Sequence, residues 1–312
     1  MKIFVFLAVA VFAFALIFLV AGYFSFAHAC KRSKRRDPSL RGYVDPKRYK
    51  PYDREVAEAL ARYKAIDAER VCTLSRDGLR LSAAYIPART EGNKLVIVFH
   101  GYRSCAVADF ACISEELLER GYSVLAVYQR AHGESDGNYI TFGALEKYDC
   151  LSWCEYAVNR FGERVEIYLY GVSMGGATVL MASGLDLSEN VKGIIADCPF
   201  TTPWDIIKRR LWLRYKIPVF PMIYFMNYWS RQLAGFDFRA DSSVEAVAKT
   251  DLPILLIHGK ADTYVPISMS EKISENAGGR CRLLRVDGAR HARAYLVDRQ
   301  RYLYEFLKFT EG

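Results

Sequence analysis

The feature that most constrains the fold of this chain is the pentapeptide Gly171-Val172-Ser173-Met174-Gly175, because of its place in the hydrophobic pattern. Residues 165–170 before it are β-branched and aromatic, as in a buried strand, and residues 176–182 after it favour a helix. A serine on so tight a strand-to-helix turn needs small neighbours, which the two glycines supply. The pattern therefore predicts a nucleophile elbow, with the Ser173 hydroxyl above a sheet and a helix N-terminus that favours developing negative charge.

A nucleophilic serine of this kind needs a histidine base, and the chain has five histidines: His28, His100, His132, His258 and His291. The expected chain order is serine, acid, histidine, so the three histidines before Ser173 are excluded. Of the two that remain, His258 lies only four residues before Asp262, the candidate acid described below, and at the start of the same loop. His291 follows the expected strand 281–286 and is predicted to be the base. The alternative is that His291 is a surface histidine on a basic loop.

The predicted acid is Asp262, which follows the apolar run 253–257. A loop at the carboxyl edge of a strand can present a carboxylate to the far ring nitrogen of the base and fix its tautomer. Asp197, after the expected strand 193–196, is the alternative, since some serine hydrolases carry the acid one strand earlier. Either aspartate could instead cap a helix or a turn.

The oxyanion hole is assigned to two backbone N–H groups. One is that of Tyr102, which follows the buried run 95–99 and the turn at Gly101. The other is that of Met174, the residue directly after the nucleophile. Both groups act through the main chain, so the side chains at these positions carry little information.

The chain from about Val71 to Phe309 resembles the α/β-hydrolase family, in the bacterial branch of serine aminopeptidase-like and lysophospholipase-like hydrolases. The resemblance rests on ordered motifs: His100-Gly101, the run Gln129 to Gly137, the elbow, the run Ala196 to Phe200, His258-Gly259 with Asp262 and Val265-Pro266, and His291. One departure is Tyr128, where the family usually has an aspartate. That position is ordinarily structural, so the departure bears on local hydrogen bonding and not on the triad.

Residues 70–312 are predicted to form one α/β-hydrolase domain. Strand and helix patterns alternate without internal repeats, which favours a mostly parallel sheet with helices on both faces, and we expect eight strands. About fifty residues separate the expected strands ending at Asp197 and starting near Leu252, too many for a simple crossover. This stretch is expected to be a helical cap insertion, about 199–250.

The cap sequence is rich in aromatic and basic residues. Residues 203–232 hold eight aromatic residues: Trp204, Trp212, Tyr215, Phe220, Tyr224, Phe225, Tyr228 and Trp229. Five basic residues lie close together among them: Lys208, Arg209, Arg210, Arg214 and Lys216. One interpretation is a lid whose aromatic face lines an acyl pocket or enters the membrane interface. The other is that the aromatic residues bury the cap against the sheet.

Residues 1–30 are expected to be a transmembrane anchor. Residues 3–27 contain no charged side chain over 25 positions, more than the roughly 20 needed to cross a bilayer. The alternatives are a secretory signal peptide cleaved after Ala27-His28-Ala29, or a lipoprotein signal at Cys30. The uncharged run is far longer than the roughly 7–15 residues of a signal-peptide core.

Charge around this segment predicts its orientation. Lys2 precedes it, whereas five basic residues lie between Lys31 and Arg36, which places the hydrolase domain in the cytoplasm of a single-pass membrane protein. Scattered cysteines suit a reducing compartment, and Cys150 and Cys154 are interpreted as core residues rather than zinc ligands.

The net charge of +8 is concentrated in one segment. Residues 31–50 carry nine basic and two acidic side chains, a net charge of +7, and Lys2 adds one. Residues 51–312 therefore have no net charge, and nucleic acid is excluded as a partner. Residues 31–69 are therefore expected to be a basic juxtamembrane linker and helical lead-in, held near anionic lipid headgroups. The alternative, if the predicted membrane topology is wrong, is that this basic segment is a solvent-exposed run of charges without a role at the membrane.

Together these features predict a membrane-anchored serine hydrolase that cleaves a carboxylic ester of an acyl lipid or another hydrophobic ester. Ser173 attacks, His291 transfers the proton, Asp262 orients His291, and an acyl-enzyme forms without cofactor or metal. The membrane is engaged through residues 3–27 and, in one interpretation, the cap. A serine aminopeptidase is the alternative, but it should keep an acidic group in the cap for the substrate amine. A non-catalytic scaffold is the third possibility.

Overall fold

The computed structural model describes residues 1–33 and 46–312. At its centre is one eight-stranded sheet in the order β1-β2-β4-β3-β5-β6-β7-β8, in which β2 is antiparallel to both neighbours and the other pairs are parallel. The prediction of eight mostly parallel strands is confirmed. The strands are β1 (Glu69–Leu74), β2 (Arg80–Ile86), β3 (Lys94–Phe99), β4 (Tyr122–Tyr128), β5 (Glu166–Val172), β6 (Val191–Asp197), β7 (Ile254–Gly259) and β8 (Cys281–Val286).

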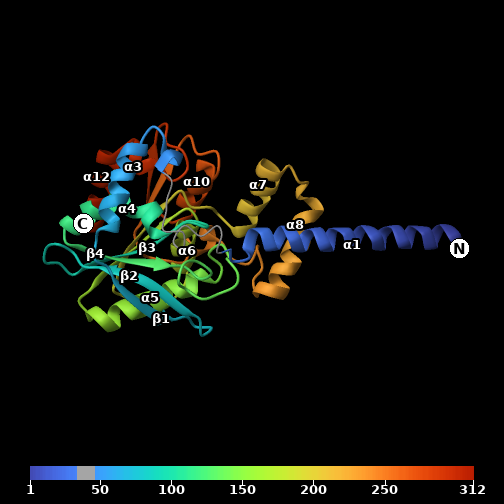
Figure 1. Cartoon of the computed structure of the whole chain (residues 1–312), viewed down its shortest axis with the longest axis horizontal. Coiled ribbons are helices and arrows are strands. Elements are labelled where there is room, and N and C mark those ends of the chain that lie inside the picture. Colours follow the sequence, from blue (N-terminus) through green and yellow to red (C-terminus); the bar gives the residue numbers. More distant parts are fainter. Residues whose placement is uncertain (34–45) are drawn as a thin grey trace.

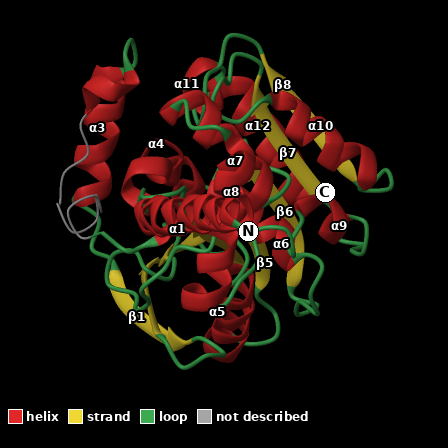
Figure 2. Cartoon of the chain, turned by 90° about the vertical axis from the view of Figure 1, so that its right-hand side faces the viewer, coloured by secondary structure: helices red, strands yellow, loops and turns green. Residues whose placement is uncertain are grey.

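Helices cover both faces of the sheet (Figure 2), and this is why the central strands are almost continuously apolar. In β3, Leu95, Ile97 and Phe99 face one layer, and Val96 and Val98 face the other. The first layer consists of α5 (Glu146–Phe161), α6 (Met174–Ala182), α9 (Ser243–Val247) and α10 (Ile267–Asn276). The second consists of α3 (Asp53–Lys64), α4 (Ala106–Glu119), α11 (Ala294–Val297) and α12 (Arg299–Glu311).

The insertion between β6 and β7 forms a helical cap of α7 (Pro203–Tyr215), α8 (Val219–Trp229) and the π-helix η3 (Ser230–Ala234). The Thr202 hydroxyl caps α7 by accepting a hydrogen bond from the N–H of Asp205 at 3.0 Å. Helix α9 also belongs to this insertion, but its Val247 is buried in the core beneath the sheet. The cap that stands apart from the body is therefore α7, α8 and η3.

Helix α1 (Lys2–Cys30) projects from the body, with α7 and α8 beside its C-terminal half (Figure 1). Among the described residues it is the one helix long and apolar enough to cross a membrane. The chain leaving it is attached to the body, because the N–H of Ile140 donates to the carbonyl of Cys30 at 2.7 Å and the N–H of Arg32 donates to that of Asn138 at 2.8 Å. Of the expected linker, residues 34–45 lie outside the described part, and η2 (Pro46–Tyr49) leads into α3.

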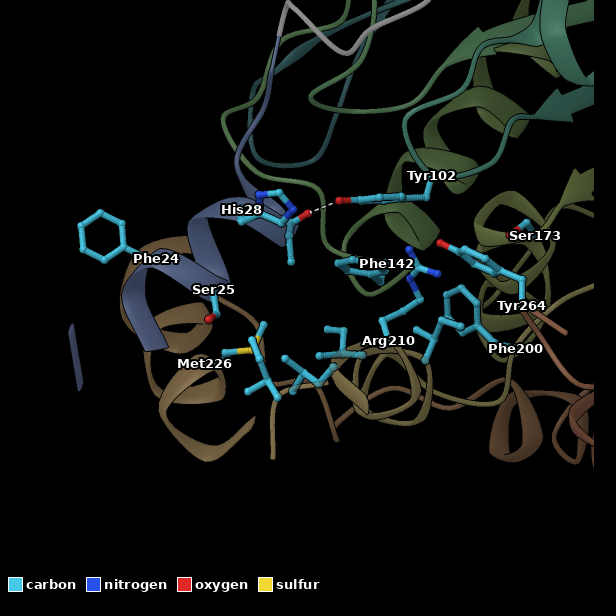
Figure 3. Close-up of a pocket in the computed structure, with 15 residues that line it drawn as sticks. Phe24, Ser25, His28, Tyr102, Phe142, Ser173, Phe200, Arg210, Met226 and Tyr264 are labelled. Atoms are coloured by element: carbon cyan, nitrogen blue, oxygen red, sulfur yellow. Dashed lines mark hydrogen bonds between the residues drawn. The ribbon is translucent and has the colours of Figure 1, made fainter. Parts of the chain in front are cut away.

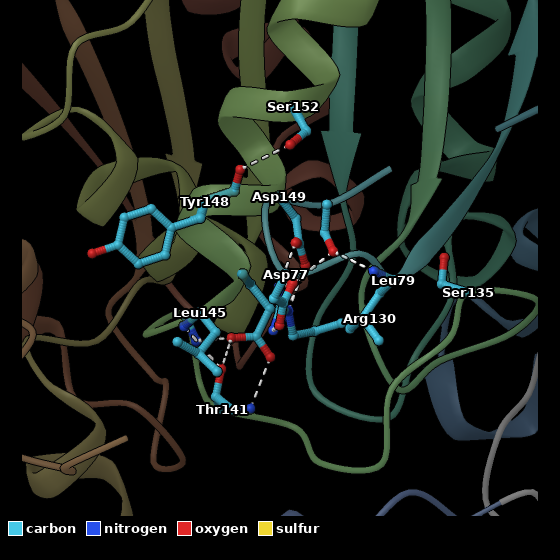
Figure 4. A network of polar contacts seen from close by, with 12 residues as sticks. Asp77, Leu79, Arg130, Ser135, Thr141, Leu145, Tyr148, Asp149 and Ser152 are labelled. Atoms are coloured by element: carbon cyan, nitrogen blue, oxygen red, sulfur yellow. Dashed lines mark hydrogen bonds and ion pairs between the residues drawn. The ribbon is translucent and has the colours of Figure 1, made fainter. Parts of the chain in front are cut away.

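A network of ionic and hydrogen bonds fixes the loop between β4 and α5 (Figure 4). The guanidinium of Arg130 pairs with Asp149 of α5 at 2.6 Å and with Asp77 at 3.0 Å. The carboxylate of Glu146 accepts the N–H groups of Thr141 and Gly143, each at 2.8 Å. A buried arginine keeps its charge and needs anionic partners, so its pairing with two carboxylates holds this loop in one defined conformation.

Candidate active site

Ser173 lies on the turn between β5 and α6 and has a left-handed backbone, with φ of 55°. A Cβ added to Gly171 would lie 2.2 Å from the carbonyl carbon of Gly175, and one added to Gly175 would lie 1.8 Å from the carbonyl oxygen of Phe99. No side chain fits at either position. The two glycines therefore allow the strand and helix to approach, and the strained serine is held at the carboxyl edge of the sheet.

The structure brings Ser173, His291 and Asp262 together in one line of hydrogen bonds. Nε2 of His291 lies 2.9 Å from Oγ of Ser173, and its Nδ1 lies 2.6 Å from Oδ2 of Asp262. These residues follow β5, β8 and β7, so loops at the carboxyl ends of parallel strands join positions that are distant in the chain. The geometry is that of a nucleophile, a base and an orienting acid.

Asp262 is held as a carboxylate by the groups around it. Its Oδ1 accepts the N–H groups of Tyr264 and Val265, at 2.8 and 2.9 Å. Burial alone would raise the pKa of Asp262, but hydrogen bonds from His258 and His291 outweigh burial and hold the pKa well below its usual range. The carboxylate is thus ionised beside the ring that would become positively charged.

Asp197, the alternative acid, is buried and bonded elsewhere. Its Oδ2 accepts the hydroxyl of Tyr302 at 3.1 Å, and its backbone carbonyl accepts the N–H of Ser173 at 2.7 Å. Burial raises the pKa of Asp197 to about 6. The structure places Asp262, and not Asp197, at Nδ1 of His291, whereas Asp197 supports the elbow through its main chain.

The two residues assigned to the oxyanion hole flank the serine. Met174 is the first residue of α6, so its N–H has no carbonyl within the helix to pair with. Tyr102 lies on the loop after β3, and a Cβ added to Gly101 of that loop would lie 3.5 Å from the Cβ of Ser173. Asp109 of α4 fixes the loop by accepting the N–H of Gly101 at 2.7 Å. Tyr102 therefore lines the space above Ser173, and Met174 directly follows the serine in the chain.

Two neighbours of the triad were missed by the sequence analysis. His258 is buried with its Nε2 3.5 Å from Oδ2 of Asp262 and its Nδ1 2.7 Å from Oγ of Ser270. The Tyr264 ring stacks on His291 at 4.7 Å. Both residues lie in the segment that contains Asp262. The motif His258-Gly259 at the start of this segment was the sequence signal for a residue near the acid.

A pocket of about 340 Å³ opens above Ser173 (Figure 3). The body contributes mainly aromatic side chains, among them Tyr102, Phe142 and Phe200. Helix α1 contributes Phe24, Ser25, His28 and Ala29. The cap contributes six residues, mostly aliphatic: Ile206, Ile207, Arg210, Leu211, Ile217 and Met226. The space is predominantly apolar, as an acyl chain requires.

No described aromatic side chain of the cap lines the pocket, so the expectation of an aromatic acyl pocket is wrong for these residues. Trp204 is half-buried, and its ring contacts that of Tyr224 at 5.3 Å. Trp212, Phe220, Tyr224 and Tyr228 are 48–75% exposed. Phe225 and Trp229 instead pack against α1, and the Tyr215 side chain lies outside the described part. The outward aromatic residues fit the interpretation of a membrane-facing surface.

The three consecutive basic residues 208–210 of the cap differ in their surroundings. Lys208 is exposed, but Arg209 donates to the backbone carbonyls of Thr263 and Tyr264, at 2.8 and 3.1 Å. Arg210 lies over the Tyr264 ring, 4.2 Å from its centre, and faces the pocket. The Arg214 side chain lies outside the described part. Each cation thus has a different environment, which the sequence could not reveal.

One group of described residues has the spacing of a metal site. Ligand atoms of Cys198, Asp262 and His291 lie within 4.8 Å of one another. Burial raises the pKa of the Cys198 thiol far above its usual value, so this cysteine is protonated and a poor metal ligand. The other two residues are already hydrogen-bonded to each other, and the group is better explained as part of the triad.

The chain is similar to several known proteins. Residues 90–238 match the family model described as serine aminopeptidase, S33. The Bacillus subtilis protein YqkD is 31% identical over 195 residues, which cover 62% of this chain and 64% of YqkD. The lysophosphatidylserine lipase ABHD12 of Danio rerio is 24% identical over 203 residues, which cover 60% of this chain and 48% of the lipase. The match thus spans less than two thirds of either relative.

A solved structure with a similar fold is that of a Pyrococcus furiosus esterase. The two superpose with a TM-score of 0.65 over 80% of this chain and 92% of the esterase, at 24% sequence identity. At this identity the likeness concerns the fold.

Proposed function

The chain belongs to the α/β-hydrolase superfamily, and on this premise we propose that it is a membrane-anchored serine hydrolase that cleaves carboxylic esters of a hydrophobic acyl chain. The observation that carries the proposal is the line from Ser173 through His291 to Asp262, at 2.9 and 2.6 Å, at the base of an apolar pocket. A nucleophile, a base and an acyl-sized space occur together there.

The proposed reaction is acyl transfer in two steps. Oγ of Ser173 attacks the ester carbonyl while Nε2 of His291 takes its proton, and the oxyanion accepts hydrogen bonds from the N–H groups of Tyr102 and Met174. His291 then protonates the departing alkoxide, which leaves as the alcohol. Water, deprotonated by His291, attacks the acyl-enzyme and releases the carboxylic acid and the free serine. Asp262 holds the His291 ring and stabilises its charged form throughout.

The pocket favours an ester over the aminopeptidase alternative. An aminopeptidase must bind a substrate ammonium group, for which a carboxylate in the pocket is the natural partner. The described residues that line the pocket include no aspartate or glutamate, and Arg210 supplies a positive charge instead. The lipase relative's name points to a lipid ester, which agrees with this lining.

The proposal includes the membrane. Helix α1 would cross the bilayer with the basic residues after it on the cytoplasmic side, which places the hydrolase domain there. Part of that basic flank also serves the fold, since the guanidinium of Arg32 donates to the carbonyls of Gly133 and Ser135, each at 2.5 Å.

The test is a substrate comparison with the full chain purified in detergent. Wild type should hydrolyse p-nitrophenyl esters from acetate to palmitate, with higher kcat/KM for the longer acyl chains, and should leave leucine p-nitroanilide intact. Ser173→Ala should reduce ester hydrolysis by several orders of magnitude. Cleavage of the anilide in preference to the esters would favour the aminopeptidase, and full activity of Ser173→Ala would remove the proposed nucleophile.

A further inference from the structure

One wall of the pocket belongs to α1, the helix that the sequence analysis assigned to anchoring alone. Phe24, Ser25, His28 and Ala29 are spaced by one, three or four positions and therefore lie on one side of the helix. All four line the pocket that contains Ser173, and Figure 3 shows the end of α1 at the border of this pocket. A membrane anchor that served only as a tether would not need to contact the active-site pocket.

Helix α1 is packed closely against the cap. A Cβ added to Gly22 would lie 2.5 Å from the Cβ of Phe225, so the two helices approach as near as a glycine allows. The ring of Phe18 stacks on that of Phe225 at 5.9 Å. The indole N–H of Trp229 donates to the carbonyl of Leu19 at 2.8 Å. The contact between α1 and α8 is therefore specific.

The end of α1 is also bonded to the loop beside the nucleophile. The hydroxyl of Tyr102 donates to the carbonyl of Ala29 at 2.7 Å, and the guanidinium of Arg103 donates to that of His28 at 2.8 Å. The Tyr102 ring stacks on Phe142, another pocket residue, at 5.1 Å. The backbone of α1 is thus held against the same loop that borders Ser173.

The length of α1 determines where its pocket-lining residues 24–29 lie relative to the hydrocarbon region of the bilayer. A helix needs roughly 20 apolar residues to cross a bilayer, so a span that begins near Ile3 ends near Gly22. The contact of Phe18 and Gly22 with α8 then lies at the edge of the hydrocarbon, and residues 24–29 follow just beyond it. The cap also exposes the aromatic side chains of Trp212 and Phe220, as a surface at the membrane interface does.

We propose that α1 is part of the substrate-binding site: the acyl chain of an ester drawn from the bilayer lies along residues 24–29 of α1, with its carbonyl at Ser173. This inference rests on the proposed function. Phe24 and His28 are exposed and stand at the mouth, whereas Ser25 and Ala29 are half-buried and face the interior. Ser25 and Ala29 are therefore specificity-determining residues for acyl length.

The experiment uses the full chain reconstituted in vesicles of a diether phosphatidylcholine, which offers no ester of its own. The variants are Ser25→Phe and Ala29→Phe, and the matched control is Val20→Phe, at a position on α1 that is 48% exposed and does not line the pocket. The readout is the ratio of kcat/KM for p-nitrophenyl laurate to that for the butyrate. Labelling of Ser173 by a small fluorophosphonate shows that each variant has an assembled site.

The ratio should fall in both pocket variants and stay near the wild-type value in Val20→Phe. Each methylene excluded from an apolar pocket changes affinity about fourfold, so a ring that displaces about three methylenes lowers the ratio on the order of 60-fold. If both pocket variants label normally and keep the ratio within about threefold of wild type, α1 is not a wall of the acyl site. If wild type hydrolyses no ester, the proposed function fails, and this inference fails with it.

Discussion

Asp262→Asn separates the two candidate acids, because the amide keeps the shape of the side chain and changes only the contacts of Oδ2, which faces His291 and, at 3.5 Å, His258. The amide oxygen can still accept the N–H groups of Tyr264 and Val265, as Oδ1 of the carboxylate does. The amide NH₂ then faces Nδ1 of His291 and donates to it. His291 must carry its proton on Nε2, where it can no longer accept the proton of Ser173.

The expected magnitude follows from the 2.6 Å contact between His291 and Asp262. An Asp-to-Asn change at this position of a Ser-His-Asp triad costs about 10⁴-fold in kcat, or about 5 kcal/mol in the barrier. Asp197→Asn should cost less than about tenfold, because Asp197 bonds Tyr302 and contacts the elbow through its main chain, which the substitution leaves unchanged.

The assay is the initial rate of hydrolysis of a soluble short-chain p-nitrophenyl ester by the full chain in detergent, with near-ultraviolet circular dichroism as the control for folding. Both variants should retain the wild-type spectrum. If Asp197→Asn is the more damaging of the two while folded, the acid is Asp197 and the triad assignment is wrong.

Four further predictions test the packing, the electrostatics and the topology. Gly22→Leu places a side chain where a Cβ would already lie 2.5 Å from the Cβ of Phe225. The substitution should lower the thermal unfolding midpoint in detergent by several degrees. A midpoint equal to that of wild type would show that α1 and α8 do not pack this closely. Phe225→Ala should destabilise the chain by about 2–4 kcal/mol in a denaturant titration, and Trp212→Ala, which removes an exposed ring, should leave stability unchanged and weaken association with vesicles. Burial raises the folded-state pKa of both Asp197 and Asp149 to about 6, so wild type should lose stability as the pH rises from about 4 to 6, and Asp197→Asn should show a smaller loss; parallel pH profiles of the two melting temperatures would contradict it. A reporter fused after Gly312 should be active only in its cytoplasmic form, and activity of an extracellular-type reporter would reverse the topology.

The sequence could predict the elbow and the sheet because both leave local patterns. The tight turn around Ser173 requires small residues at positions 171 and 175, and the sequence has glycine at both. The continuous apolar sequence of β3 indicates a strand that is buried on both faces of the sheet. Chain order left only His258 and His291, and the position of His258 in the loop of the candidate acid favoured His291. Asp262 was preferred by its place after a strand, with Asp197 still open as the alternative. The geometry around Asp262 and His291 agrees with that selection, although their catalytic roles stay predictions.

The role of α1 could not be predicted, because its sequence is apolar on every side and no face stands out. The available signal was the small residues Gly22, Ser25 and Ala29, whose spacing of three and four positions is typical of a helix that packs closely on another. The pocket lining was likewise hidden. Composition could identify the aromatic residues of the cap, but only the path of α7 and α8 decides that Ile206 and Met226 turn inward and Phe220 outward.

The most direct test of the account is to find where a lipid-like acylating probe attaches. The full chain in vesicles should be treated with a dodecyl fluorophosphonate, which loses fluoride to an activated serine, and then digested and mapped by mass spectrometry. The account predicts one adduct, on Ser173, that is absent from Ser173→Ala and greatly slowed in His291→Ala. An adduct on another residue, or unchanged labelling of Ser173→Ala, would contradict it.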